Sequence, residues 1–488
     1  MFDTRIGLGA DANGVPLLTK DANARYIYWN PSHAAANDTN AGTDPALPKK
    51  TLKSAWWSLR DGYGDWLLMA QGATSTEGFS NIAPRNGLSA QYPIVVTTYN
   101  PADPANPAQM RQGMVTVGTN PTDSLLDIGD PKAANRTVFE NITFDKPATN
   151  NWSVFGLGTG QKDLMFFNVR FLRTPVAFQG DYSGNVVSTR MSNLVFRRCV
   201  FAYAYSPSGH AQGMYLWTTN GVTIEDSIFY HNGWQGTDRN AVTTDTGALP
   251  NIFKHGAYFG TLTENTVFRR NLVADNSSHG LQLRGGGVAT DNVFAKNPLN
   301  VTVGGGDSYN LYRPNGVPYT FTNNVMVGSE DIDAKNPRGF GVTFMNTQDG
   351  GVASGNIVVN IGATSTGNRF SLSAAANFNQ PTYVSWTNNI QYQWNSQTLA
   401  AFTQDLGYNA YPALTFVQRS GNIIDNEVVA GNLTQPTTPF PDPKRTIASY
   451  AVAYGYSTES AFWNYAVQNP QVAWAKQIGD YVRAGYGR

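Results

Sequence analysis

Short apolar stretches return along this chain about every thirty residues, and each ends in a Phe or Val three residues after a polar position. Two of them read Phe139-Glu-Asn-Ile-Thr-Phe144 and Phe166-Phe-Asn-Val-Arg-Phe171. Self-similarity at a fixed period is typical of repeat architectures, in which one unit cannot bury its apolar face until it stacks on its neighbours. The pattern predicts a strand, a bend and a second strand in every coil.

The polar position at the bend is usually Asn. We place it at Asn141, Asn168, Arg198, Asp226, Arg270, Asp291, Asn324, Asn356, Asn389 and Asn422. Asn tolerates a left-handed backbone, which suits a tight bend. Asn side chains stacked at the strand spacing of about 4.8 Å can also hydrogen-bond to one another as a ladder. The closing apolar residues would then stack inside the coils.

Coil length distinguishes the two repeat architectures that fit this pattern. A β-propeller blade needs about forty residues and four strands, and the spacing here is shorter. The sequence therefore predicts an all-β fold, a single-stranded parallel β-helix over residues 26–435. A helix at Thr51–Arg60, between strands that begin at Tyr26 and Trp66, is expected to cap the open end of the first coil, whose strand edges would otherwise be exposed.

The two ends of the chain differ from the coils. Residues 1–25 form a polar N-terminal segment, and residues 436–488 combine a Pro-rich linker with a helical segment. Helices are predicted over Ser460–Val467 and from Asn469, as N-cap before Pro470, to Gly485. We expect this segment to cap the last coils, with an oligomer contact as the alternative.

Composition narrows the functional classes. Charged residues make up 14% of the chain, and 34 basic residues balance 34 acidic ones, which argues against nucleic acid as a partner. No apolar stretch approaches the roughly twenty residues of a membrane span. The single Cys199 excludes an intrachain disulfide and is expected to be a buried thiol. The first residues lack a signal-peptide pattern, so we expect a trimmed leader or release in a phage particle, and an extracellular or virion-associated location.

The N-terminal motifs carry a family resemblance. The strand Tyr26-Ile-Tyr, the loop Asn40-Ala-Gly-Thr43 and the helix Thr51-Leu-Lys-Ser-Ala55 resemble the start of the pectate-lyase-like, right-handed parallel β-helix superfamily. Coils around Ser278-His-Gly-Leu-Gln-Leu-Arg284 resemble those of polysaccharide lyases and phage tailspikes. The resemblance implies a right-handed fold and a polysaccharide substrate, bound along the first strand of each coil. A tailspike would be a homotrimer, and a secreted bacterial enzyme would more often be a monomer.

The family geometry places four first strands, which begin at Gly213, Gly256, Gly280 and Asn300. Their outward columns would be Tyr215, Tyr258, Gln282 and Thr302, and beside them Trp217, Gly260 and Arg284. Sugar rings stack on aromatic faces and sugar hydroxyls take hydrogen bonds, so Tyr215, Trp217 and Gln282 are predicted to bind substrate. Directly before two of the strands stand Lys254, His255 and His279. We predict the catalytic set Lys254, His255, Tyr258, His279 and Arg284, against the alternative that the histidines hold turns and that Lys254 and Arg284 face solvent.

The longest inter-coil loop runs from Tyr230 to Phe253 and explains a coil of 44 residues between Phe229 and Val273. Long loops in compact domains are often functional, and this one could form one wall of a groove. It supplies Trp234, Asp238 and Asp245 as further substrate-binding candidates, and the next inter-coil loop supplies Asp275.

Three functions remain open. The first is a polysaccharide lyase that cleaves a uronate-containing bacterial or cell-wall polymer by β-elimination, using a cation, a base and an acid. The second is a tailspike glycoside hydrolase, which needs two carboxylates about 5–9 Å apart. The third is a non-catalytic glycan-binding spike. The Lys, His, Tyr and Arg set favours the lyase. Calcium-dependent members of the family cluster acidic ligands near the second strand, and no such cluster stands out here, so we predict no cofactor or metal and keep calcium as the open alternative.

Overall fold

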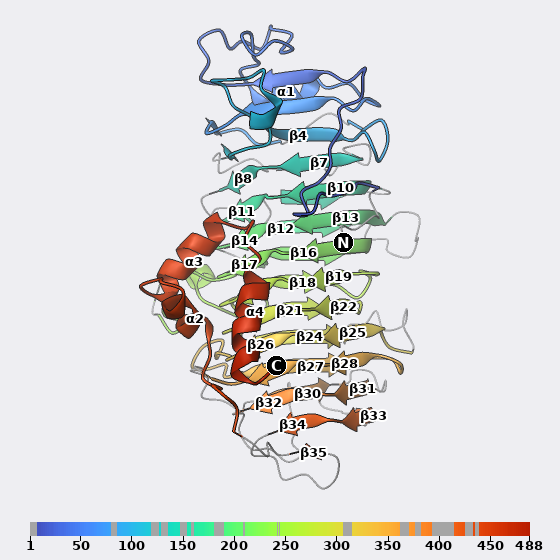
Figure 1. Cartoon of the computed structure of the whole chain (residues 1–488), viewed down its shortest axis with the longest axis vertical. Helices are drawn as coiled ribbons and strands as arrows, with labels where there is room; N and C mark the ends of the chain where they lie inside the picture. The colour runs from blue at the N-terminus through green and yellow to red at the C-terminus, as the bar shows by residue number, and fades with distance from the viewer. Residues whose placement is uncertain are drawn as a thin grey trace. The chain divides into compact units, whose positions relative to one another are not determined.

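The computed structural model describes residues 7–79, 85–118, 126–127, 135–146, 154–157, 161–179, 190–207, 210–241, 243, 245–305, 315–361, 370–375, 382–392, 414–424, 433–434 and 439–488. The chain divides into two compact units. Unit 1 comprises Met1–Pro207 and Thr218–Ile224, and unit 2 comprises Ser208–Trp217 and Glu225–Arg488. The strands form three parallel sheets, and each unit holds strands of all three, which successive coils add in turn (Figure 1). This order is that of a parallel β-helix, as the sequence predicted.

Unit 1 begins with the strand predicted at Tyr26. Its first sheet contains β1 (Tyr26–Trp29), β2 (Trp66–Ala70), β4 (Ile94–Tyr99), β7 (Thr137–Glu140), β10 (Lys162–Phe167), β13 (Met191–Arg197) and β16 (Thr219–Glu225). Its second sheet contains β3 (Thr74–Ser75), β5 (Val115–Val117), β8 (Ile142–Asp145), β11 (Arg170–Leu172) and β14 (Val200–Ala202). Its third sheet contains β6 (Leu126–Asp127), β9 (Val154–Leu157) and β12 (Val176–Gln179).

Unit 2 repeats the same three-sheet plan. Its first sheet contains β19 (Val267–Arg269), β22 (Gly287–Thr290), β25 (Tyr319–Thr322), β28 (Val352–Ser354), β31 (Thr382–Thr387) and β33 (Leu414–Ser420). Its second contains β17 (Ile228–Tyr230), β20 (Leu272–Ala274), β23 (Val293–Ala295), β26 (Val325–Val327), β29 (Ile357–Val359), β32 (Ile390–Tyr392), β34 (Asn422–Ile424) and β35 (Leu433–Thr434). Its third contains β15 (Met214–Trp217), β18 (Ala257–Phe259), β21 (His279–Leu283), β24 (Leu299–Gly304), β27 (Phe340–Met345) and β30 (Phe370–Ala375).

The predicted cap is present in unit 1. Helix α1 (Leu52–Trp57) starts at Thr51, whose side chain accepts a hydrogen bond from the Ser54 amide. Its buried Trp56 stacks on Phe139, with ring centroids 6.4 Å apart and ring planes within 3°. Below Phe139 the column continues through Phe166 and Phe196 at 5.2 and 4.9 Å. The helix thus closes the apolar column, although it is shorter than the predicted span that ended at Arg60.

The bends between the first and second sheets use left-handed backbone, as predicted. Their φ angles lie between 53° and 70° at Asn141, Asn168, Arg198, Asp226, Arg270, Asp291, Asn323, Gly355, Asn388 and Gly421. The first six positions match the prediction. The last four lie one residue earlier than predicted, because the true partner of Phe294 in the column is Met326 and not Val327.

The asparagine ladder is also present, but it occupies the residue after the left-handed one. Its rungs are Asn271, Asn292, Asn324, Asn356, Asn389 and Asn422. From Asn292 onward, each side-chain oxygen accepts from the backbone amide and the side-chain amide of the preceding rung, as Asn324 does from Asn292 at 3.1 and 2.9 Å. The rungs are completely buried. The left-handed residues Asp226 and Arg270 form an ion pair beside this ladder, with 2.7 Å between the carboxylate and Nε.

The N-terminal segment lies on the outer face of the first sheet in unit 1. Leu8 is buried against Tyr28, Tyr99 and other residues of that face, and Val15 packs beside it. Arg111 and Arg198 donate to backbone carbonyls of the same segment. The described part of residues 1–25 therefore shields apolar sheet surface, although its composition is polar.

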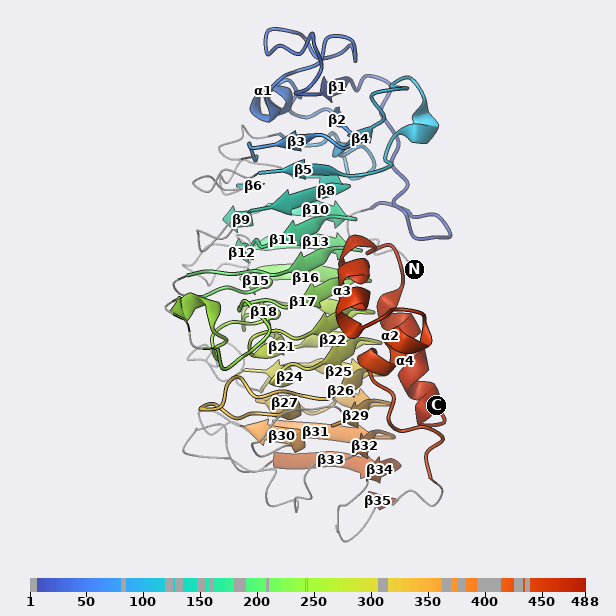
Figure 2. The same ribbon diagram turned by 90° about the vertical axis from the view of Figure 1, so that its left-hand side faces the viewer.

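The C-terminal helices are α2 (Ile447–Ala453), α3 (Glu459–Gln468) and α4 (Trp474–Gly485). Helix α4 contacts β23 and β26, and Arg483 donates to the carbonyls of Asn323 and Gly355 (Figure 2). The expected cap on the last coils is therefore wrong, because the helices lie along the second sheet of unit 2. The predicted N-cap at Asn469 is also wrong, since α4 begins four residues after Pro470. Helix α2 was not predicted.

Cys199 is buried as a thiol, and burial raises its pKa to about 12, as expected for a structural cysteine. Among the helices that the structure describes, none combines the length and apolarity that crossing a bilayer requires.

Candidate functional site

The third sheet of unit 2 brings the predicted outward columns into register. Tyr215 pairs with Tyr258, Tyr258 with Gln282, and Gln282 with Thr302. The alternate residues point inward and are buried, as at Leu216 and Phe259. We call the outward surface the tyrosine wall; it comprises Tyr215, Trp217, His255, Tyr258, His279, Gln282 and Arg284.

Aromatic rings cover one half of the tyrosine wall. The rings of Tyr215 and Tyr258 lie 5.2 Å apart, and Tyr215 stacks on Trp217 at 6.3 Å with 11° between the planes. A side chain at Gly260 would place its Cβ 1.9 Å from the Trp217 ring, so glycine is required for the indole to lie over this coil. Both tyrosines are half-buried, whereas Trp217 is only 5% exposed. The accessible aromatic surface is therefore mainly tyrosine.

A hydrogen-bonded relay occupies the other half. Nε of Arg284 donates to Oε1 of Gln282 at 2.7 Å, which fixes the orientation of the amide because an arginine nitrogen can only donate. The amide nitrogen of Gln282 then donates to Nδ1 of His279 at 2.9 Å. The guanidinium of Arg284 also lies 4.8 Å from the centre of the Tyr258 ring, within cation–π distance. Gln282 thus couples the cation of the wall to an imidazole.

The two predicted histidines are neighbours across adjacent coils. Their ring centroids lie 5.0 Å apart, and the His255 ring lies 5.4 Å from that of Tyr258. Both are buried, at 5% and 8% exposure. Burial is the main cause that lowers the pKa of His279 to about 3, and the charges of Arg284 and Arg338 add to it. Burial also places the pKa of His255 well below 6.5, and electrostatic repulsion from His279, Arg284 and His210 adds to it. Both imidazoles are therefore neutral at neutral pH.

This burial makes the stability of the protein pH-dependent. Because folding lowers the pKa of His279 from 6.5 to about 3, the unfolded chain binds the proton more tightly, and stability falls as pH drops below 6.5. We expect wild-type protein to lose about 2 kcal/mol more than His279→Gln between about pH 7 and pH 5, at about 1.4 kcal/mol per pH unit. Urea unfolding at several pH values measures this, and parallel curves for the two proteins would contradict it.

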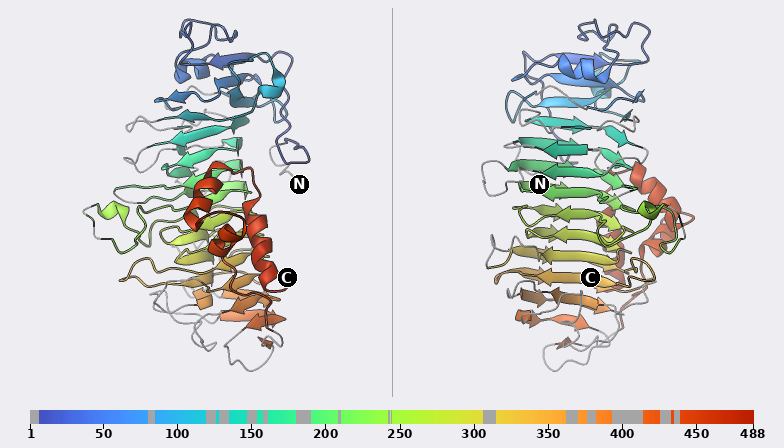
Figure 3. Two further views of the ribbon diagram at one scale, coloured as in Figure 1. Left: turned by 60° about the vertical axis from the view of Figure 1, so that its left-hand side comes forward. Right: turned by 180° about the vertical axis from the view of Figure 1, so that it is seen from behind.

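Lys254 does not join the tyrosine wall. Its side chain is buried, and its ammonium donates to the carbonyl of Gly247 within the loop that precedes β18. Burial lowers the pKa of Lys254 to about 8, against the opposing charge of Asp245. Asp245 itself is exposed and accepts from the Gly247 amide at 3.0 Å. These two predicted site residues therefore lie together in the loop, which projects outward with its 3-10 turn at Thr246–Ala248 (Figure 3).

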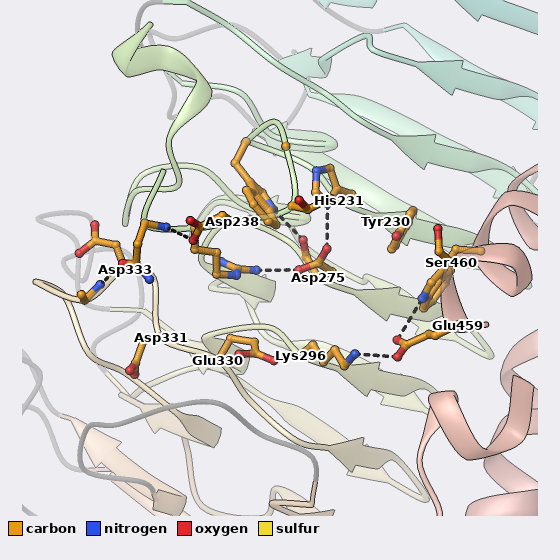
Figure 4. A pocket seen from close by; sticks show the side chains of 17 residues that line it. Tyr230, His231, Asp238, Asp275, Lys296, Glu330, Asp331, Asp333, Glu459 and Ser460 are labelled. Carbon is orange, nitrogen blue, oxygen red and sulfur yellow. Dashed lines mark hydrogen bonds and ion pairs between the residues drawn. The ribbon is translucent and has the colours of Figure 1, made fainter. Parts of the chain in front are cut away.

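The remaining predicted residues, Trp234, Asp238 and Asp275, line a separate cavity of about 690 Å³ (Figure 4). We call it the acidic pocket; its lining is Tyr230, His231, Trp234, Gly236, Thr237, Asp238, Arg239, Asn240, Asp275, Lys296, Glu330, Asp331, Asp333, Ala334, Glu459, Ser460 and Trp463. Asp275 hydrogen-bonds Nδ1 of His231 at 2.8 Å and forms an ion pair with Arg239 at 2.9 Å. Hydrogen bonding by His231 and the charge of Arg239 lower the pKa of Asp275 despite its burial. Asp275 is therefore held ionised.

Sequence reasoning missed most of this pocket. The residues His231, Asp275 and Lys296 follow β17, β20 and β23 directly, all with left-handed backbone, and each precedes an Asn. Those asparagines, Asn232, Asn276 and Asn297, form a second ladder at 2.9 Å per step. The repeated pairs His-Asn, Asp-Asn and Lys-Asn were visible in the sequence and could have located this column. Glu330, Asp331, Asp333 and Glu459 carried no such signal.

Metal ligation was also considered. In the described residues, no three His, Cys, Asp or Glu side chains gather as a group that could hold a metal ion. Independence from calcium stays a prediction.

No family model and no curated protein matches this chain. Among solved structures, pectate lyase Pel9A is 13% identical, with a TM-score of 0.40 over 91% of this chain and 87% of that chain. A rhamnogalacturonan lyase is 12% identical, with a TM-score of 0.32 over 86% and 91%. The Dettilon tailspike protein is 14% identical, with a TM-score of 0.30 over 86% and 69%. The parallel β-helix of this chain is established by its own strand pairing.

Proposed function

We propose that this chain is a polysaccharide lyase that cleaves a uronate-containing polymer by β-elimination at the tyrosine wall. The observation that carries the proposal is the contact of Arg284, Tyr258 and His255, a cation, a hydroxyl and a neutral imidazole, on neighbouring coils. In the reaction a base takes the C5 proton, the electron pair forms the C4–C5 double bond, and the C4–O bond breaks as the leaving oxygen is protonated. Each of these events requires a different kind of group.

Arg284 is suited to the carboxylate. The C5 proton becomes acidic only when charge that develops on the adjacent carboxylate is neutralised, and a preorganised cation does this without reorganisation. The guanidinium is half-buried and is positioned by Gln282 and Tyr258. A planar guanidinium also matches a carboxylate in two parallel hydrogen bonds. We therefore assign the recognition of the uronate to Arg284.

His255 and Tyr258 are suited to proton transfer. In the described part of the chain, Nδ1 of His255 is buried without a hydrogen-bond partner. The imidazole is neutral at neutral pH, so it can accept the C5 proton. The half-buried Tyr258 lies beside it and supplies a hydroxyl for the leaving oxygen. His279 and Gln282 act as positioning residues, because their mutual hydrogen bond fixes the amide that holds Arg284.

The test is incubation with a panel of uronate-containing and neutral polysaccharides, with and without a metal chelator. The expected result is ultraviolet absorbance from the unsaturated uronate, together with new reducing ends, on an acidic polymer. Reducing ends without this absorbance would replace the lyase by a hydrolase, and binding without either signal would leave a glycan-binding spike. Loss of activity with the chelator, restored by calcium, would contradict the predicted independence from metal.

A further inference from the structure

The acidic pocket is a cavity of ligand size that the proposed lyase reaction does not use. Its volume of about 690 Å³ falls within the usual range of small-molecule sites, about 300–1,000 Å³. Its lining comes from the bend after the second sheet, the start of the loop after β17, the segment after β26 and the start of helix α3. None of the seven residues of the tyrosine wall lines it.

Specific contacts hold these segments in place. On the floor, the left-handed residues His231, Asp275 and Lys296 are aligned by the second asparagine ladder. The indole nitrogen of Trp234 donates to the carbonyl of Asp275 at 2.9 Å, which fixes the loop to this floor. The pocket is therefore part of the folded coil structure and not a space between loose segments.

Helix α3 and the segment after β26 complete the pocket. Glu459 at the start of α3 pairs with Lys296 at 2.7 Å, and Trp463 stacks on Tyr230 at 4.3 Å with 9° between the planes. The Ala334 amide donates to the side-chain oxygen of Asn240 at 2.6 Å, so the two loops are joined at the rim. Figure 4 shows Asp238, Asp275, Lys296 and Glu459 around one space, with Asp331 and Asp333 at the side.

The charge of the lining selects the ligand. Six carboxylates, from Asp238, Asp275, Glu330, Asp331, Asp333 and Glu459, face two permanent cations, Arg239 and Lys296. Both cations already pair with carboxylates of the pocket. A uronate would meet like charge here, which disfavours binding. Among the described residues, no three of these carboxylates lie close enough together to hold a metal ion. Their negative charge is instead distributed around the cavity, an arrangement that suits an organic ligand.

We propose that the acidic pocket binds a saccharide that bears a free amine. Ammonium groups donate three hydrogen bonds to carboxylates, and the hydroxyls of the sugar can use the remaining oxygens. The half-buried Tyr230 supplies ring surface for a sugar, whereas Trp234 and Trp463 are only 2% and 3% exposed and form the packed wall behind it. The pocket would then take a cationic unit, while the tyrosine wall takes an acidic one. This assignment does not rest on the lyase reaction and can hold if that reaction is absent.

The experiment measures binding of glucosamine oligomers by calorimetry with the full-length chain. Asp238→Asn and Asp331→Asn are the informative variants. Both variants should fold. Asp238 is exposed. The Asp331 carboxylate accepts a hydrogen bond from the Arg338 amide, and the side-chain oxygen of Asn at position 331 can accept the same bond. We expect each to weaken binding about tenfold, as loss of a charge-assisted hydrogen bond does. Asp480→Asn is the matched control, since Asp480 is exposed on α4 and pairs with Lys476. It should bind as wild type.

Three comparisons decide the outcome. N-acetylated oligomers of the same length and uronate oligomers should bind at least tenfold more weakly than the amine form. Spermine, a polyamine without sugar, should not compete at equal charge concentration. Equal binding of the acetylated form, full competition by spermine, or unchanged affinity in both Asn variants would overturn the proposal. Arg284→Gln should leave this binding unchanged while it lowers lyase activity by about 10²–10³-fold, so failure of the two proposals can be distinguished.

Discussion

Replacement of Arg284 by Gln is expected to lower kcat/KM on the polysaccharide substrate by about 10²–10³-fold, the usual effect of removing a preorganised group that stabilises developing charge. The side chain is half-buried and contacts Gln282 and Tyr258, so its loss removes the cation of the tyrosine wall without opening the apolar core. The effect should fall on kcat as well as KM, because the charge on the carboxylate grows toward the transition state. Initial rates of ultraviolet absorbance increase measure it.

Arg445→Gln is the matched control for this variant. Arg445 also places its guanidinium over a tyrosine, at 4.6 Å from the Tyr481 ring, and also bonds a neighbouring side chain, Asp442. It lies in the C-terminal helical segment and lines neither the tyrosine wall nor the acidic pocket. Its replacement should leave activity within about twofold of wild type. If Arg284→Gln kept activity at the level of Arg445→Gln, the uronate would not be bound by Arg284.

Two adjacent asparagines are expected to respond to the same substitution with very different losses of stability. Asn324→Gly should destabilise the protein by about 3–5 kcal/mol, whereas Asn323→Gly should cost less than about 1 kcal/mol. Asn324 is a completely buried rung that accepts from the backbone and side-chain amides of Asn292 and donates to the Ala289 carbonyl at 3.0 Å. Its loss leaves several buried groups unsatisfied, each at about 1–3 kcal/mol.

Asn323 occupies a left-handed position, φ 55°, and its side chain is exposed. Glycine adopts that backbone without strain, so the change removes little from the folded state. Using glycine at both sites makes the added freedom of the unfolded chain similar in the two variants, and the difference between them reports the ladder. Urea unfolding followed by circular dichroism measures both. Equal stability of the two proteins would show that the ladder contributes little.

The coil pattern was predictable because each coil repeats the same physical requirement. Inward positions such as Leu216, Phe259 and Leu283 must be apolar, and the register of outward residues follows from the two-residue period. The bend was harder to place. Left-handed and ladder positions are adjacent and both favour Asn, so pairs such as Asn323-Asn324 are ambiguous from sequence, and the predicted column slipped by one residue in the later coils.

The candidate site was only partly predictable for a related reason. The tyrosine wall uses residues at matching positions of successive strands, so alignment of coils assembled it. The direction of the Lys254 side chain depends on a loop fold that has no period, and it points to the Gly247 carbonyl. The acidic pocket joins Asp275 to Glu459, from a helix far along the chain, and no local pattern links them. Repetition predicts coil geometry, whereas loops and docked helices require the folded structure.

The second asparagine ladder makes the register of the coils independent of the loop at residues 231–253. Asn232 at the start of that loop bonds Asn276 of the next coil at 2.9 Å, so the strands on either side keep their register whatever length of chain lies between them. Segments of other lengths and compositions could therefore be grafted between Gly233 and Phe253 with the coils unchanged. The chain thus combines a replaceable loop with a fixed frame, because the register of the coils is set by the ladder and the strand pairing and not by the loop.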